Sequence, residues 1–375
     1  MKYYLIAGEA SGDLHGANLM RALKKEDAEA DFRFFGGDLM KAQGGKLEKH
    51  YSEMAFMGFL EVLIHVRAIF RNLKQAKKAI LDYHPDALIL IDFPGFNLKI
   101  ASFAKKHGIR VFYYISPKVW AWNQKRVLSI KKNVDQLFCI FPFEVDFYKT
   151  WGMDVHYVGN PLLDAIAAHH TDSQFRVNQA LGEQQIIALL PGSRRQELKR
   201  LLTDMLQVSD DFPDYQFVIA GAPSFSIDDY QPFIGGRQIP VLFDQTYNLL
   251  LHAKAAIVTS GTATLETALF KVPQVVVYKG GRISVAIARL LVKIKFISLV
   301  NLIMGQEIVK ELIQENCTPK SIKMELERLL QDSFYRGQML GHYDQLVERV
   351  GESGASNRVA KLVVHYLGNS LKRSE

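Results

Sequence analysis

The sequence predicts an α/β protein of two doubly wound domains, each a parallel sheet with covering helices, facing one cleft. Three observations support this fold class. The chain of 375 residues is long enough for two domains. Short apolar runs rich in β-branched and aromatic residues alternate with helical patterns, which is typical of parallel sheets with right-handed crossovers. This alternation stops in a polar stretch near residues 160–184 and then starts again.

The first half contains six apolar runs of strand length, and helical patterns lie between them. The predicted strands are 2–8, 31–37, 86–92, 109–115, 136–141 and 154–159. The predicted helices are 14–25, 59–83, 96–107 and 123–132. In sheets of this kind ligands bind beyond the carboxyl ends of the strands, so these ends are where functional residues are expected.

Five further runs predict the second sheet: 185–192, 215–221, 239–244, 255–261 and 273–278. Residues 1–165 are the predicted N-terminal domain and residues 166–334 the predicted C-terminal domain. Residues 335–375 are helical with no strand after them. This last segment is therefore expected to pack back on the first domain or against a partner chain, and the second alternative leaves a homodimer open.

Composition indicates an ordinary globular protein, with 48% apolar and 23% charged residues. Two cysteines suit a reducing compartment, and the absence of a signal-peptide pattern or a long uncharged apolar run predicts a cytoplasmic protein. Residues 1–160 hold 23 Lys and Arg against 17 Asp and Glu, a net charge of +6, whereas the remainder holds 23 against 22. The first half is thus expected to meet an anionic partner.

Two strand-to-helix junctions in the second half predict a nucleotide-diphosphate site. In "LLPGSRRQELKRLL", Pro191 and Gly192 make the turn, Ser193 can cap the following helix, and Arg194 supplies charge and bidentate donors. A capped helix with solvated arginines explains this segment equally well.

The second junction is "IVTSGTATLETALF", in which Ser260, Gly261 and Thr262 form the turn and Glu266 follows in the helix. Hydroxyls and backbone N–H groups suit a phosphate, and a carboxylate suits ribose hydroxyls. The alternative is a helix cap at Thr262 with a favourable early acid. Two such junctions in one half, with "NLIMGQE" after them, favour the nucleotide site.

The glycine-rich turn "GEASGDLHG" follows the first predicted strand, but its acids would repel a diphosphate. It also lacks the G-x-G-x-x-G spacing of a dinucleotide site. Glu9 and Asp13 are instead candidates for binding sugar hydroxyls, with helix capping as the alternative for Asp13. Gly12 and Gly16 lie on one helix face and allow close packing.

Asp92 ends the apolar run in "LILIDFPGFN". A carboxylate at the edge of a parallel sheet in apolar surroundings has a raised pKa and suits a general base. A turn-forming or capping aspartate is the alternative. Trp120 and Trp122 follow the next predicted strand, where they either stack on sugar rings or close the core. The chain has no metal-binding motif, so no metal or cofactor is expected.

Residues 54–78 combine an apolar cluster with a cationic helix, which is typical of a membrane-surface segment. The alternative is an amphipathic core helix with a solvated basic face. A second case is 283–300, where the core-helix alternative carries more weight than it does for the Met and Phe cluster of 54–78. The residues expected to face the membrane or acyl chains are Met54, Phe56, Met57, Phe59, Arg67 and Arg71.

Eight segments in order resemble the lipid-A-disaccharide synthase family, from about residue 3 to residue 319. They are "AGEASGDLHGANLMRAL", "FMGFLEVL", "IDFPGFN", "YYISPKVWAWNQKR", "FPFEVDFY", "LLPGSRRQE", "TSGTATLE" and "SLVNLIMGQEIVKELIQENCTP". Each motif is short, but the combination is specific.

The resemblance implies the B-type glycosyltransferase fold and an inverting, metal-independent reaction at the inner membrane of a Gram-negative bacterium. The donor would be UDP-2,3-diacylglucosamine and the acceptor 2,3-diacylglucosamine 1-phosphate. By resemblance, Asp92 is the general base, while Glu9, Ser11 and Asp13 lie on the acceptor side. The implied UDP-side residues are Ser193, Arg194, Ser260, Gly261, Thr262, Glu266, Asn301, Gln306 and Glu307.

Two segments depart from the family pattern. "VGNP" has Asn160 where histidine is expected, and "VYKGGRIS" differs from the usual aromatic-rich version. Rival functions are a UDP-GlcNAc 2-epimerase, which uses a similar fold, and a membrane-bound nucleotide-sugar sensor, which would tolerate loss of the Asp92 carboxylate. A nucleic-acid partner is not expected, because the basic segment lacks the motifs of nucleic-acid readers.

Overall fold

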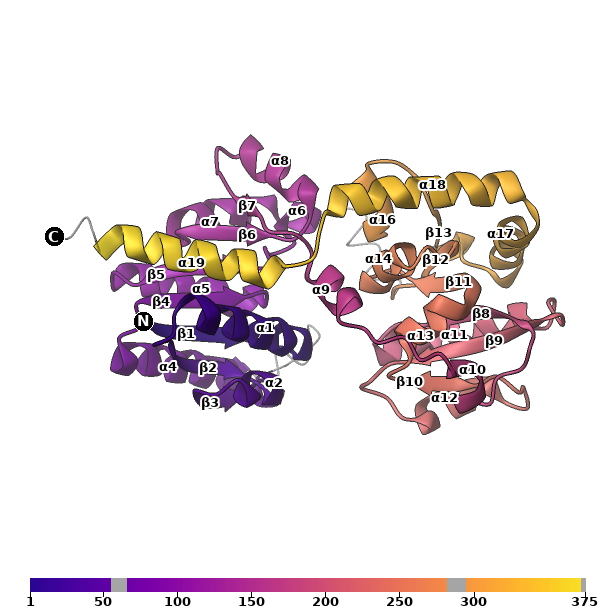
Figure 1. Cartoon of the computed structure of the whole chain (residues 1–375), viewed down its shortest axis with the longest axis horizontal. Coiled ribbons are helices and arrows are strands. Elements are labelled where there is room, and N and C mark those ends of the chain that lie inside the picture. Colours follow the sequence, from indigo (N-terminus) through magenta and orange to yellow (C-terminus); the bar gives the residue numbers. More distant parts are fainter. Residues whose placement is uncertain (55–65, 282–294, 372–375) are drawn as a thin grey trace. The chain divides into compact units, whose positions relative to one another are not determined.

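The computed structural model describes residues 1–54, 66–281 and 295–371 (Figure 1). Its chain contacts divide it into two compact units: residues 1–164 with 352–375, and residues 165–351. The first unit is called unit 1 and the second unit 2.

Unit 1 is a seven-stranded parallel sheet in the order β3-β2-β1-β4-β5-β6-β7. Its strands are β1 (Lys2–Ala7), β2 (Asp31–Gly36), β3 (Lys46–His50), β4 (Ala87–Ile91), β5 (Arg110–Tyr114), β6 (Gln136–Cys139) and β7 (His156–Tyr157). Its helices are α1 (Ala10–Glu26), α2 (Asp38–Ala42), η1 (Tyr51–Glu53), α4 (Val66–Tyr83), α5 (Pro94–Lys106), α6 (Val119–Trp122), η2 (Gln124–Arg126), α7 (Val127–Asn133), α8 (Pro142–Thr150), α9 (Pro161–Ala167) and α19 (Ala355–Leu371). The last three residues of α9 belong to unit 2.

Unit 2 is a six-stranded parallel sheet in the order β10-β9-β8-β11-β12-β13. Its strands are β8 (Gln185–Leu190), β9 (Tyr215–Gly221), β10 (Val241–Phe243), β11 (Ala253–Thr259), β12 (Gln274–Tyr278) and β13 (Lys310–Ile313). Its helices are α10 (Phe175–Asn178), α11 (Arg195–Ser209), α12 (Ile227–Ile234), α13 (Thr246–His252), α14 (Thr262–Leu269), α16 (Leu299–Met304), η3 (Gln314–Asn316), α17 (Pro319–Gln331) and α18 (Ser333–Val350).

Both sheets confirm the doubly wound fold class. All eleven predicted strands are present, within a few residues at each end. Strands β3 and β13 were not predicted from the sequence, and each is one of the two edge strands of its sheet. An edge strand carries polar residues, as "KLEKH" and "KELI" do, so it lacks the apolar run by which a buried strand is recognised.

The core of unit 1 lies on both faces of its sheet. On one face β1, β4 and β5 pack against α4, α5 and α7 through residues such as Ile80, Leu88 and Ile100. On the other face Leu5, Ile89 and Phe112 pack with residues of α1 and α19. Continuous burial on both faces is why the strands of a parallel sheet are apolar throughout.

The C-terminal segment is divided between the units. Helix α18 packs on α14, α16 and α17 of unit 2, whereas α19 packs on α1 of unit 1 (Figure 1). The Arg358 guanidinium anchors this return by donating to the carbonyl oxygens of Val158 (2.7 Å), Glu352 (2.8 Å) and Ser353 (2.9 Å). Within this chain, the terminal helix thus packs back on the first unit.

Candidate active site

The order of each sheet reverses at its centre, and the predicted site residues follow the strands at that point. In unit 1 the reversal lies between β1 and β4, which precede Glu9 and Asp92. In unit 2 it lies between β8 and β11, which precede Ser193 and Ser260. Such switch points are where doubly wound sheets bind ligands.

Asp92 follows β4 on a left-handed turn. Its φ is 44° and that of Phe93 is 50°, and neither residue is a glycine. Helix α5 begins directly afterwards with Pro94 at its first turn. The ring of Phe93 packs where a side chain at position 8 would be, so Gly8 is required at the end of β1. A bulky residue in this backbone region is strained, and strain of this kind gathers at functional sites.

The Asp92 carboxyl group has a raised pKa, chiefly because it is partly buried. The positive charge of Lys118 opposes this shift, the negative charge of Glu9 adds to it, and the Phe93 N–H opposes it by hydrogen bonding. Asp92, Glu9 and Lys118 follow three different strands, and their charges act on one another at this end of the sheet. The prediction of a carboxyl with raised pKa at this strand end is therefore confirmed.

The N-terminal motif divides between exposed and structural residues. Glu9 is half-buried and precedes α1, and Ser11 is exposed in the first turn. Asp13 is 3% exposed, and its carboxylate accepts hydrogen bonds from the N–H groups of Gly37 (2.7 Å), Leu39 (3.0 Å) and Met40 (3.0 Å). Its expected place on the acceptor side is therefore wrong, because the carboxylate caps α2.

The membrane-facing prediction needs one correction. Met54 is 3% exposed and belongs to the apolar core beneath α4. Helix α4 buries Leu73, Ala76 and Ile80 while Arg67 and Arg71 are exposed, so the core-helix alternative describes this helix, with a basic outer face. Phe56, Met57 and Phe59 lie outside the described residues, as does most of 283–300.

Glu144, at the start of α8, is a fully buried carboxyl group that was not among the residues predicted from the sequence. It accepts hydrogen bonds from the Trp120 indole N–H (3.1 Å) and from the backbone N–H groups of Ile140 (3.2 Å) and Phe141 (3.1 Å). Burial raises its pKa to about 7. Trp120 thus closes the core, and Glu144 ties the loop that carries Lys118 to the end of β6. The only signal in the sequence was an acid three residues after a helix-starting turn.

Asn160, which departs from the family pattern, is also a structural residue. It is 2% exposed and accepts the N–H of Leu162 (3.0 Å) at the start of α9. Its side-chain amide donates to the carbonyl oxygen of Ile140 (3.3 Å). The position therefore joins β6 to the segment that leaves unit 1.

In unit 2, the turn after β8 is shaped by Gly192 at φ +94°, where a side chain would also overlap Glu197. The expectation that Ser193 caps α11 is wrong, since the cap position is Arg194. Ser193 and Arg194 are both exposed, and Arg194 forms an ion pair with Glu197 (2.9 Å). The turn thus presents a hydroxyl, a guanidinium and the free N–H groups of a helix start.

The turn after β11 presents Gly261 and Thr262 to solvent at the start of α14. The cap position is Gly261, so the alternative of a cap at Thr262 is not realised. Ser260 donates from its hydroxyl to the carbonyl oxygen of Ile297 (2.9 Å). Glu266 accepts a hydrogen bond from the Tyr247 hydroxyl (2.9 Å), and burial raises its pKa while that hydrogen bond lowers it.

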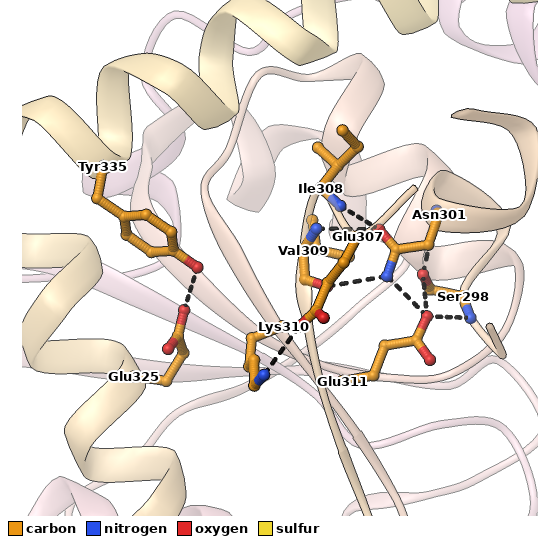
Figure 2. A network of polar contacts seen from close by, with 9 residues as sticks. All are labelled: Ser298, Asn301, Glu307, Ile308, Val309, Lys310, Glu311, Glu325 and Tyr335. Atoms are coloured by element: carbon orange, nitrogen blue, oxygen red, sulfur yellow. Dashed lines mark hydrogen bonds and ion pairs between the residues drawn. The ribbon is translucent and has the colours of Figure 1, made fainter. Parts of the chain in front are cut away.

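Asn301 stabilises a loop (Figure 2). Its side-chain oxygen accepts the N–H groups of Ile308 (2.7 Å) and Val309 (3.0 Å), and its nitrogen donates to the Val309 carbonyl (2.9 Å) and to Glu311 (2.8 Å). With 0% exposure and every polar atom engaged, it cannot contact UDP directly, which corrects that expectation. The loop it holds carries Gln306 and Glu307, which are exposed, with Glu307 paired to Lys310 (2.9 Å).

Within residues 1–54, 66–281 and 295–371, no group of three or more His, Cys, Asp or Glu side chains is arranged to hold a metal ion. In the same ranges, no helix has both the length and the apolar content needed to cross a membrane.

Comparison with known proteins decides the family. A family model for lipid-A-disaccharide synthetase matches residues 3–362. The chain belongs to the lipid-A-disaccharide synthase family. The lipid-A-disaccharide synthase of Trichlorobacter lovleyi is 40% identical over 373 residues, covering 98% of this chain and 97% of the relative. That of Syntrophotalea carbinolica is 40% identical over 367 residues, covering 96% and 94%.

Family membership makes the protein a hexosyltransferase of lipid A biosynthesis, which confirms the resemblance seen in the sequence. Solved structures confirm the B-type glycosyltransferase fold. The UDP-GlcNAc 2-epimerase of Neisseria meningitidis has a TM-score of 0.71 at 13% identity, covering 97% of this chain and 100% of that chain. The calicheamicin glycosyltransferase CalG4 has a TM-score of 0.61 at 16% identity, covering 98% of each chain.

Proposed function

We propose that this protein transfers 2,3-diacylglucosamine from UDP to the 6-hydroxyl of 2,3-diacylglucosamine 1-phosphate, with inversion at the anomeric carbon. The observation that carries the proposal is the environment of Asp92. This residue is a partly buried carboxylate with a raised pKa on a strained turn, at the switch point of the first sheet. A base with these properties suits a sugar hydroxyl as its proton donor.

In this mechanism the acceptor 6-hydroxyl gives its proton to the Asp92 carboxylate while its oxygen attacks the anomeric carbon of the donor. The bond from that carbon to the diphosphate oxygen breaks on the opposite face, and UDP leaves with the bonding electron pair. The result is a β-1,6-linked disaccharide 1-phosphate. Glu9 and Ser11, on the turn that follows β1, bind hydroxyl groups of the acceptor.

Unit 2 binds the donor in this proposal. The starts of α11 and α14 offer free N–H groups to the diphosphate, together with the Arg194 guanidinium and the hydroxyls of Ser193 and Thr262. Ser260 and Gly261 shape the turn that precedes α14. Glu266, oriented by Tyr247, accepts hydrogen bonds from the ribose, while Gln306 and Glu307 approach UDP from the loop held by Asn301. These donors stabilise the departing UDP without a metal ion.

The acyl chains of both substrates place the reaction at an anionic membrane surface, the cytoplasmic face of the inner membrane. The net charge of +6 on residues 1–160 and the exposed Arg67 and Arg71 on α4 support peripheral binding through unit 1. Phe56, Met57 and Phe59, which precede α4 in the sequence, are the proposed apolar contacts.

The test is an assay of the purified protein with UDP-2,3-diacylglucosamine and 2,3-diacylglucosamine 1-phosphate in EDTA, read by mass spectrometry. Disaccharide 1-phosphate and UDP in equal amounts support the proposal, and a β linkage in the product by NMR supports inversion. Release of a 2-epimerised sugar nucleotide from UDP-GlcNAc, without disaccharide, would instead support the epimerase alternative. UDP-sugar binding without any reaction would support a sensor.

A further inference from the structure

The backbone of Asp92 is held by two buried side chains that come from different elements. Its carbonyl oxygen accepts hydrogen bonds from the Tyr113 hydroxyl on β5 (2.6 Å) and from the Asn97 side-chain nitrogen on α5 (2.8 Å). Its N–H donates to the carbonyl oxygen of Tyr114 (3.1 Å). Both peptide groups of the residue are therefore fixed to neighbouring elements.

These contacts oppose a backbone strain. A left-handed conformation costs a residue other than glycine about 1–3 kcal/mol, and Asp92 and Phe93 adopt it in succession. Such a pair persists only where the surroundings hold it. Aspartate tolerates this conformation better than most residues, but phenylalanine does not. The hydrogen bonds to the Asp92 carbonyl oxygen act on the peptide that joins the two.

Both donors are buried, and the Asn97 nitrogen also lies 3.5 Å from the carbonyl oxygen of Ile6 on β1. Tyr113 and Asn97 are each 0% exposed. The Asn97 nitrogen also reaches the Ile91 carbonyl oxygen (3.2 Å), while its side-chain oxygen has no partner. An unpartnered buried oxygen costs about 1–3 kcal/mol, so Asn97 contributes through its donor side alone. Burial raises the pKa of the Tyr113 hydroxyl, which as a protonated phenol is the donor in its hydrogen bond to Asp92.

We propose that Tyr113 and Asn97 are positioning residues for glycosyl transfer, which hold Asp92 in the left-handed conformation that places its carboxylate beside Glu9 and Lys118. The inference rests on the proposed function, in which Asp92 is the base. Without these donors the peptide after Asp92 rotates toward a relaxed conformation and the carboxylate leaves its place. A displacement of about 1 Å at a catalytic group costs about 100-fold in rate.

Tyr114 provides a matched control. It is the next residue on β5, it is also 0% exposed, and its side chain packs on the opposite face of the sheet, where its hydroxyl lies 3.5 Å from that of Ser356. Tyr113→Phe and Tyr114→Phe each remove one buried hydroxyl from the same strand. They differ in whether that hydroxyl binds Asp92.

The experiment measures kcat, the KM of each substrate and the melting temperature for wild type, Tyr113→Phe, Tyr114→Phe and Asn97→Ala in the full chain. Tyr113→Phe is expected to lower kcat about 10- to 100-fold, with the donor KM and UDP affinity within about 2-fold of wild type. Its melting temperature should match that of Tyr114→Phe, whose kcat should stay near wild type. Asn97→Ala should also lower kcat, as Tyr113→Phe does.

A double-variant cycle separates positioning from a structural effect. If Tyr113 acts through Asp92, adding Tyr113→Phe to Asp92→Asn leaves the residual rate nearly unchanged, whereas independent effects multiply. Equal kcat for Tyr113→Phe and Tyr114→Phe, in a protein that Asp92→Asn inactivates, overturns the positioning role and spares the proposed function. Full activity of Asp92→Asn would show that Asp92 is not the general base. The positioning role of Tyr113 and Asn97 would then be overturned as well.

Discussion

The two units place polar residues at the same topological point but hold them in different ways. In unit 1 the turn after β4 uses Asp92 and Phe93 in a strained conformation, and buried side chains fix it. In unit 2 the turns after β8 and β11 use Gly192 and Gly261, and the side chains that follow are exposed. A general base must be held in one position to accept a proton from one hydroxyl group. A diphosphate can instead be bound by backbone N–H groups and by the charge of an exposed, flexible side chain.

The largest effect is expected from Asp92→Asn. Asparagine keeps the size and the tolerance for a left-handed conformation but cannot accept the proton, so kcat should fall about 1000-fold, within the range of a general base. Calorimetry should show unchanged UDP affinity, because UDP binds unit 2 in the proposal. A kcat within a few-fold of wild type would contradict this comparison of the two units, because the Asp92 carboxylate would then not be the general base.

The next effect concerns Glu144, which ties the Lys118 loop to unit 1. Its folded-state pKa of about 7 lies above the ordinary glutamate pKa of 4.5. Folding therefore favours the protonated carboxyl group. Its contribution to the free energy of unfolding is fully present below pH 4.5 and is lost as the pH rises through 7. Wild type should lose on the order of 3 kcal/mol of unfolding free energy over this interval relative to Glu144→Gln.

Chemical denaturation of both proteins at intervals from pH 4.5 to 8 measures this difference. Glu26→Gln is the control, because it removes a carboxyl group from an exposed position on α1 of the same unit. Parallel pH profiles for wild type and Glu144→Gln would mean that the buried carboxyl does not gain a proton on folding.

In unit 2, Arg194→Ala is expected to weaken UDP binding about 10-fold, the effect of one charge-assisted contact of about 1.4 kcal/mol. The control is Arg237→Ala. Arg237 is also paired with an acid, but that acid is Asp210, at the opposite end of α11. Calorimetric titration with UDP distinguishes the two. Equal affinities for both variants would show that the turn after β8 does not bind the diphosphate.

The last effect is expected from the basic face of α4. Replacing Arg67 and Arg71 together by glutamine should reduce binding to vesicles rich in anionic lipid by about 10-fold or more, at about 1 kcal/mol for each charge near the surface. Lys131→Gln with Lys132→Gln removes the same charge from α7 of the same unit as a control. Vesicle co-sedimentation that falls equally for both pairs would indicate net charge rather than a specific face.

The sequence by itself determined the two doubly wound sheets, the strand ends at which the candidate site residues lie, and the family. These follow from local information: apolar runs mark buried strands, and Asp92 and Gly192 stand directly after such runs. The pKa shift of Asp92 was also predictable, because any carboxyl at the end of a buried strand loses solvent.

Only the tertiary structure decided what most polar side chains bind. Asp13 caps a helix that begins 25 positions later, Tyr113 fixes a residue 21 positions earlier, and Asn301 closes a loop around Glu311. Helix α19 likewise returns to unit 1 after the whole of unit 2. The physical reason is common to all four. A hydrogen bond or a packed face depends on which distant groups the fold brings within reach, and a motif records only neighbours along the chain.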